Sequence, residues 1–142
     1  MRTAVHQAEL SAKANPPRSR RRATRLPSDL AGLRTLERLT FHVQDITDVL
    51  ASAIWEEGAG TVIPDAVVGP LSDALESVAS VVDHWRDAES GELANRLARA
   101  KDSINALSDA VAEAAADQSP VNAPASVAMS LRRILTVVLS SE

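Results

Sequence analysis

The chain has 142 residues, of which 45% are hydrophobic and 2% aromatic, and it contains no cysteine. This length suits a single domain with its own hydrophobic core. The lack of cysteine excludes disulfides, thiolate nucleophiles and zinc sites that use sulfur ligands. With five glycines and no tyrosine, the composition argues against a glycine-rich nucleotide loop and against an aromatic platform for single-stranded nucleic acid.

The formal net charge of −4 combines a basic N-terminal segment with an acidic body. Residues 1–26 carry seven Lys or Arg against one Glu, whereas residues 27–142 carry eight basic and eighteen acidic side chains. The Asn15-Pro16-Pro17 sequence and the like charges from Arg18 to Arg25 predict a flexible basic arm over residues 1–26. Such an arm suits contact with phosphate, on nucleic acid or on lipid head groups.

The first predicted helix spans residues 28–57, from Ser28 as N-cap to the residue before Gly58. Its apolar residues recur at intervals of three and four, as they do along one face of a helix. We therefore expect a core-facing row made of Leu36, Leu39, Val43, Ile46, Leu50 and Ala53.

Three further helices are predicted over residues 70–88, 91–117 and 124–140. The segment between Pro64 and Pro70 is expected to form one helical turn or an angled entry to the second helix. The third helix has the most regular pattern, with apolar residues at Leu93, Leu97, Ala100, Ile104, Leu107, Val111 and Ala114. In the last helix, Val127, Leu131, Ile134, Leu135 and Val138 are expected to face inward.

Four amphipathic helices and no strand pattern predict an all-α, antiparallel up-and-down four-helix bundle over residues 27–142, preceded by the flexible basic arm. The most apolar run covers only residues 134–139, whereas a transmembrane helix needs about 20 residues. No apolar signal-peptide segment follows the N-terminal charges. We therefore expect a cytoplasmic protein.

The histidines and acidic residues do not form a recognisable catalytic or metal-binding pattern. His42 is expected at a solvated rim of the first helix. Asp83 and Asp87 flank His84 at helical spacing, which is one half of a carboxylate metal motif, but no second copy of the motif exists. The sequence therefore predicts no enzyme, no cofactor and no metal site.

Two tryptophans and an arginine run remain as candidate contact residues. Trp85 is in phase with Val78 and Val82, which predicts a core position, whereas Trp55 near a helix end suits either rim packing or a partner-facing anchor. The arginine run either binds phosphate and lipid head groups or is a solvated tail. Its candidate contact residues are Arg18, Arg20, Arg21, Arg22 and Arg25.

The sequence also resembles a known family along most of its length. The segments LRTLERLTFHVQDITDVL, IPDAVVGPLSDALESVASVVDHW, ELANRLARAKDSINALSDAV and SVAMSLRRILTVVL are similar, in the same order, to the cytoplasmic C-terminal helical region of fusaric acid resistance (aromatic acid exporter) membrane proteins. Export in that family is attributed to membrane-spanning repeats that this sequence lacks. The resemblance therefore implies an accessory domain at the inner face of the membrane, with the arm toward the lipid, and it transfers no substrate-binding residue.

Together these observations predict a non-enzymatic helical-bundle interaction module, acting as a cytoplasmic accessory or regulatory domain related to an aromatic acid exporter. The expected partner is a membrane transporter subunit, an anionic membrane surface or a second copy of the chain. The alternative is a small nucleic-acid-associated protein that uses the basic arm.

Overall fold

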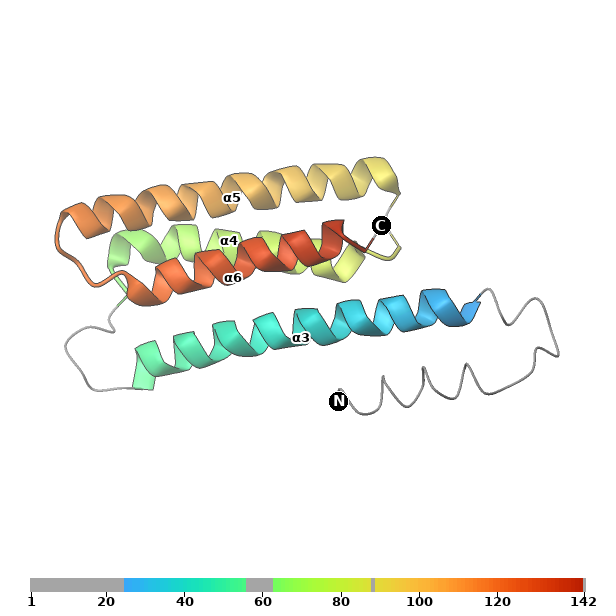
Figure 1. Ribbon diagram of the computed structural model, residues 1–142. Coiled ribbons are helices and arrows are strands. Elements are labelled where there is room, and N and C mark those ends of the chain that lie inside the picture. Colours follow the sequence, from blue (N-terminus) through green and yellow to red (C-terminus); the bar gives the residue numbers. More distant parts are fainter. Residues whose placement is uncertain (1–24, 56–62, 88, 142) are drawn as a thin grey trace.

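The computed structural model describes residues 25–55, 63–87 and 89–141. They form four helices: α3 (Arg25–Trp55), α4 (Asp65–His84), α5 (Ser90–Ala116) and α6 (Asn122–Leu139). Consecutive helices run in opposite directions (Figure 1), and the described residues contain no strand. The prediction of an all-α antiparallel four-helix bundle is confirmed. Residues 1–24 of the predicted arm lie outside the described residues.

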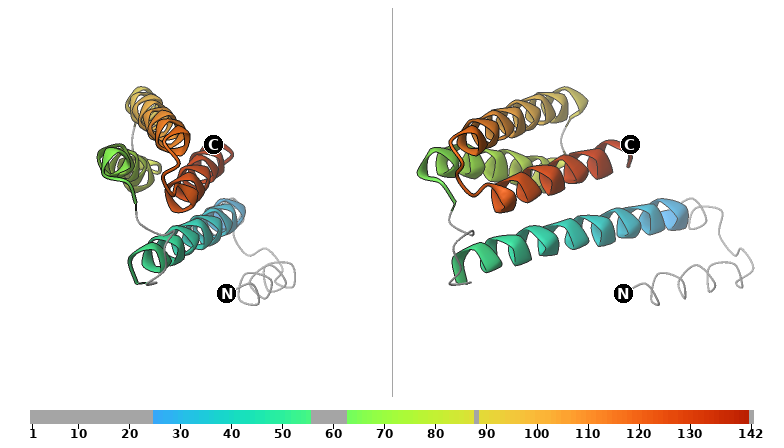
Figure 2. Two further views of the ribbon diagram at one scale, coloured as in Figure 1. Left: turned by 90° about the vertical axis from the view of Figure 1, so that its left-hand side faces the viewer. Right: turned by 60° about the vertical axis from the view of Figure 1, so that its left-hand side comes forward.

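The four helices do not share their contacts equally. Helices α4, α5 and α6 each pack against the other two, and an end-on view shows them as a triangle (Figure 2). Helix α3 lies beneath this triangle and, within the described part of the chain, packs against α6 alone. The bundle is therefore a three-helix core with a fourth helix attached along one edge.

Helix α5 buries its apolar face as its spacing predicts. The buried residues of this face are Leu93, Leu97, Ala100, Ile104, Leu107 and Ala114. Val111 is partly buried and packs against the core. Because alternating steps of three and four keep side chains on one face, a single partner surface formed by α4 and α6 covers the row.

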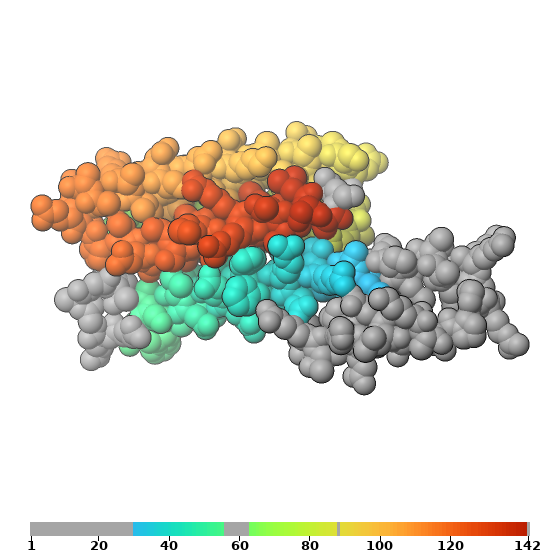
Figure 3. All heavy atoms as spheres, viewed as in Figure 1, coloured from blue at the N-terminus to red at the C-terminus, as the bar shows by residue number. Residues whose placement is uncertain are grey.

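Helix α6 is the most enclosed of the four because it has neighbours on two sides. Leu131 and Val138 belong to the predicted inward face and are 2% and 1% exposed. Ser130 and Val137 lie about 100° further around the helix, yet they are only 2% and 3% exposed. This second buried face was not predicted from the sequence, and it exists because α3 packs against α6 (Figure 3).

Helix α4 begins at Asp65 and not at Pro70, so the predicted start of this helix was wrong: the segment after Pro64 is helical and continuous with the rest of α4. Pro64 adopts an extended conformation just before the helix, and Pro70 lies inside it. The proline removes one backbone hydrogen bond in the second turn. Val67 precedes it in the helix and is fully buried, a gain of about 1.5–3 kcal/mol for an aliphatic side chain that favours the longer helix.

Candidate interaction surface

The two sides of α3 differ sharply in their surroundings. Leu39 and Ile46 face α6 and are 4% and 7% exposed, whereas Leu36 and Val43 are 40% and 50% exposed. The prediction that all of these residues face the core was therefore wrong for Leu36 and Val43. The physical reason is that α3 has only α6 to pack against, and one neighbour covers only part of a wide apolar face.

The uncovered side carries a regular row of uncharged residues, which we call the α3 stripe. Its members alternate in steps of three and four: Leu33, Leu36, Thr40, Val43, Thr47, Leu50 and Ile54. Six of them are exposed and Leu50 is partly buried. Such spacing over three heptads is typical of a helix that packs along a second helix.

The two threonines of the α3 stripe do not interrupt its apolar character. The Thr40 hydroxyl donates a hydrogen bond to the carbonyl oxygen of Leu36 at 2.8 Å, and the Thr47 hydroxyl donates to that of Val43 at 2.9 Å. With their donors already satisfied inside the helix, these side chains can be covered by a partner without leaving an unpaired hydroxyl proton.

The α3 stripe lies on the side of α3 that turns toward the end of α4. Gly32 is one helical turn before Leu36, and a Cβ atom added at Gly32 would lie 3.3 Å from Nη2 of Arg86. Arg86 in turn places its guanidinium 5.6 Å from the centre of the Trp85 ring. Trp85 is partly buried and packs against the core, as its phase predicts. The two helices themselves make no packing contact in the described residues.

Trp55 ends α3 with the most exposed large apolar side chain in the described residues, at 81%. Its neighbour Ile54 is 70% exposed. Phe41 is 64% exposed and meets only the edge of the His42 ring, at 5.5 Å between centroids. A tryptophan this exposed gains little from packing within the chain. Its role as a partner contact remains a prediction, and the surface around it is consistent with one.

Polar residues mark the opposite edge of α3, where it meets α6. Asp45 accepts a hydrogen bond from Ser130 of α6. Nδ1 of His42 is buried without a hydrogen-bond partner. Burial lowers the pKa of His42, the positive charges of Arg133 and Arg38 lower it further, and Asp45 opposes them. His42 is therefore a partly buried rim residue that favours its neutral form.

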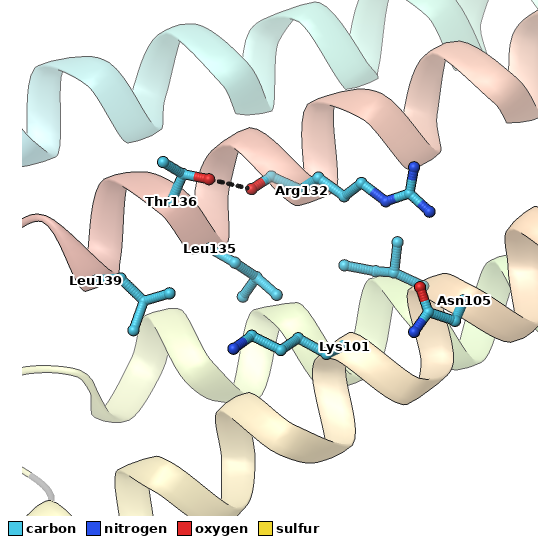
Figure 4. Close-up of a pocket in the computed structure, with 7 residues that line it drawn as sticks. Lys101, Asn105, Arg132, Leu135, Thr136 and Leu139 are labelled. Carbon is cyan, nitrogen blue, oxygen red and sulfur yellow. Dashed lines mark hydrogen bonds between the residues drawn. The ribbon is translucent and has the colours of Figure 1, made fainter.

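A shallow groove of about 300 Å³ lies between α5 and α6 (Figure 4). Its apolar part consists of Ile104, Leu135 and Leu139, and Asn105 and Thr136 line its polar part. Lys101 extends over the groove from α5, and Arg132 reaches from α6 to the Ser108 hydroxyl at 2.9 Å. Its charged lining residues, Lys101 and Arg132, are both basic.

The junction of α4 and α5 is structural. Arg96 donates hydrogen bonds to the Ser80 hydroxyl and to Glu92, and the second bond lowers the pKa of Glu92. Asp83 and Asp87 are exposed near the end of α4. Across residues 25–55, 63–87 and 89–141, no three His, Cys, Asp or Glu side chains come together as metal ligands would.

The predicted phosphate contacts fall mostly outside the described residues: Arg18, Arg20, Arg21 and Arg22 precede them, and Arg25 is the first residue of α3. In the described part of the chain, no helix combines the length and apolarity of a membrane span. No protein-family model, curated protein or solved structure matches the chain.

Proposed function

We propose that this protein is a helical-bundle interaction module that acts by binding a protein partner through the uncovered side of α3. One observation carries the proposal: α3 exposes six large apolar side chains between 40% and 81% while it packs against a single neighbouring helix. These residues are Leu33, Leu36, Phe41, Val43, Ile54 and Trp55. Leu33, Leu36, Val43 and Ile54 belong to the α3 stripe, whereas Phe41 and Trp55 lie further around the helix. An apolar row left exposed in this way marks a protein interaction site in soluble proteins.

A membrane transporter related to aromatic acid exporters is the class of partner that we propose, on the basis of the sequence resemblance. In this arrangement the basic arm contacts the anionic inner surface of the membrane and α3 contacts the transporter. Each basic residue near such a surface contributes about 1 kcal/mol. The arm alone also carries the alternative proposal of nucleic-acid association, in which α3 has no direct role.

Fractionation of cells of the native host tests separately how α3 and the basic arm contribute to membrane association. Three full-length forms are compared: the wild type, a Leu36→Glu/Ile54→Glu double variant of α3, and an arm variant in which Arg18, Arg20, Arg21 and Arg22 become Gln. Both α3 positions are exposed, so the double variant should keep its fold. Circular dichroism checks that it does.

We expect the wild type to sediment with membranes and the α3 variant to move to the soluble fraction. If the arm variant leaves the membrane fraction and the α3 variant stays in it, the contact is with the lipid surface and not with a protein partner. If all three forms stay soluble, the proposed transporter is excluded. Binding to DNA or RNA that disappears in the arm variant and weakens steeply with salt would then favour the alternative.

A further inference from the structure

We infer that the α3 stripe binds the same stripe on a second copy of this chain, with the two α3 helices antiparallel about a two-fold axis near Val43. The inference rests on one part of the proposed function, that a protein binds the uncovered side of α3, and it places a second copy of the chain there in place of a transporter. A two-fold interface requires that a surface be complementary to itself. Three properties of the α3 stripe meet that requirement.

The first property is the order of the residues. Read from Leu33 to Ile54, the stripe runs Leu, Leu, Thr, Val, Thr, Leu, Ile, which is nearly the same in either direction. An antiparallel pair therefore brings Leu33 and Leu36 of one copy to Ile54 and Leu50 of the other, and the threonines meet near the centre. Large side chains meet large ones, as close packing requires.

The second property is that the stripe itself brings few unpaired polar groups into the contact. None of its seven residues is charged, and the hydroxyl protons of Thr40 and Thr47 are already bonded to backbone carbonyls. The nearby guanidinium of Arg86 lies beside Gly32, before the stripe begins. On the side of the stripe away from α6, the flanking residues are Glu37, Gln44 and Ala51. In the antiparallel pair Glu37 approaches Ala51 of the second copy, so two like charges do not come together.

The third property is the charge along the chain, which selects the direction of the pair. The segment before α3, residues 1–26, carries a net charge of +6, and α3 itself has Arg34 and Arg38 in its first half and Asp45 and Asp48 in its second. A parallel pair would place two strongly basic segments side by side. The antiparallel pair separates them and also opposes the two helix dipoles.

The size of the stripe sets the strength of the dimer. Residues 33 to 54 span about 33 Å of helix, and covering half the helix circumference buries on the order of 500 Å² per copy. Standard interfaces bury about 800 Å² per partner, so a weak dimer is expected, one that dissociates on dilution to micromolar concentrations.

Sedimentation equilibrium of the full-length protein between about 5 and 500 µM covers this range. We expect the wild type to dimerise, and Val43→Glu to weaken dimerisation by at least about tenfold, because it places two carboxylates near the axis. Val43 is 50% exposed, so the monomer should tolerate the change. Met129→Glu, at a residue of α6 that is 54% exposed, is the matched control and should leave the dimer intact.

Disulfide trapping tests the direction of the pair, because the chain has no cysteine of its own. Under mild oxidation, Val43→Cys should form a covalent dimer. Leu33→Cys should not, except when mixed with Ile54→Cys, which lies beside it in the antiparallel pair. Ala98→Cys on the exposed side of α5 controls for random collision. Efficient trapping of Leu33→Cys alone would show a parallel pair and overturn the antiparallel assignment.

Failure of this inference is distinguishable from failure of the proposed function. A wild type that stays monomeric at all concentrations, or a dimer that Val43→Glu leaves intact, rules out the α3 pair. If the α3 pair is ruled out and the Leu36→Glu/Ile54→Glu variant still leaves the membrane fraction, the proposed function stands, and a different protein binds the stripe. A dimer that Val43→Glu disrupts, together with unchanged fractionation, supports the pair and rejects the transporter.

Discussion

The Ser130 hydroxyl of α6 donates a 2.5 Å hydrogen bond to Oδ2 of Asp45 on α3, across 85 residues of sequence. Ser130 is 2% exposed and Asp45 is partly buried. A bond from a buried hydroxyl to a carboxylate is among the stronger hydrogen bonds in proteins. Because α3 has no other helix to pack against, this bond helps to fix how α3 lies along α6, and therefore which of its residues stay uncovered.

Replacing Ser130 should destabilise the attachment of α3. We expect Ser130→Ala to lower the free energy of unfolding by about 1–3 kcal/mol, because the partly buried Asp45 carboxylate loses its hydrogen bond. Urea denaturation measures the change. Ser126→Ala, at an exposed position of the same helix, should change it by less than about 0.5 kcal/mol. Equal effects of the two changes would show that the bond does not hold α3.

The two sides of α3 should respond differently to truncation. We expect Ile46→Ala to cost about 2–5 kcal/mol, because it removes a buried side chain from the contact with α6. Val43→Ala on the α3 stripe should cost less than about 0.5 kcal/mol in the monomer. Chemical denaturation at low protein concentration compares them. A large loss for Val43→Ala would mean that the stripe is covered within the chain.

Gly69 and Gly91 should respond differently to alanine. Both lie in helices, and apart from their chain neighbours an added Cβ atom would meet nothing within 4 Å. Gly69 directly precedes Pro70, whose ring crowds the Cβ atom of a preceding residue in helical conformation, so Gly69→Ala should gain little or lose stability. We expect Gly91→Ala to raise the free energy of unfolding by up to about 0.5–1 kcal/mol, because alanine loses less backbone entropy in a helix. Thermal denaturation compares the two, and a larger gain at Gly69 than at Gly91 would contradict this order.

His42 should make the bundle less stable in mild acid. Its pKa in the folded protein lies below the ordinary value, chiefly through burial and then through Arg133. Near its ordinary pKa of about 6.5, the unfolded chain therefore binds more protons at this site than the folded one. The free energy of unfolding should fall as the pH drops through this value, and less steeply in a His42→Gln variant. If the free energy of unfolding falls equally steeply with pH in both proteins, His42 is not the group responsible. NMR titration of His42 gives its pKa directly.

The amount of core that could be predicted differs from helix to helix. The buried rows of α5 and α6 followed from the spacing of their apolar residues, because a row on one face of a helix depends only on local geometry. The start of α4 could not be read in the same way. Pro70 is a local stop signal, and it is overridden by burial of Val67, which depends on the other helices.

The candidate surface was predicted only in part. Trp55 was recognised as a contact candidate from its position near a helix end, but Leu36 and Val43 of the α3 stripe were predicted to face the core. A local signal was present, since Leu33 and Ile54 make the apolar face of α3 wider than one neighbouring helix can cover. Spacing shows that a side chain is apolar and on a given face, and it does not show whether another helix covers that face.

The sequence by itself determined the four helices, their antiparallel order and most of the residues that α5 and α6 bury, because these depend on local periodicity and short connections. The tertiary structure decided that, among the helices the structure describes, α3 packs against α6 alone. That single contact buries Leu39 and Ile46, leaves Leu36 and Val43 exposed, and gives α6 its second buried face. Which half of an apolar row is covered depends on how many helices surround it, and this is a property of the packed chain.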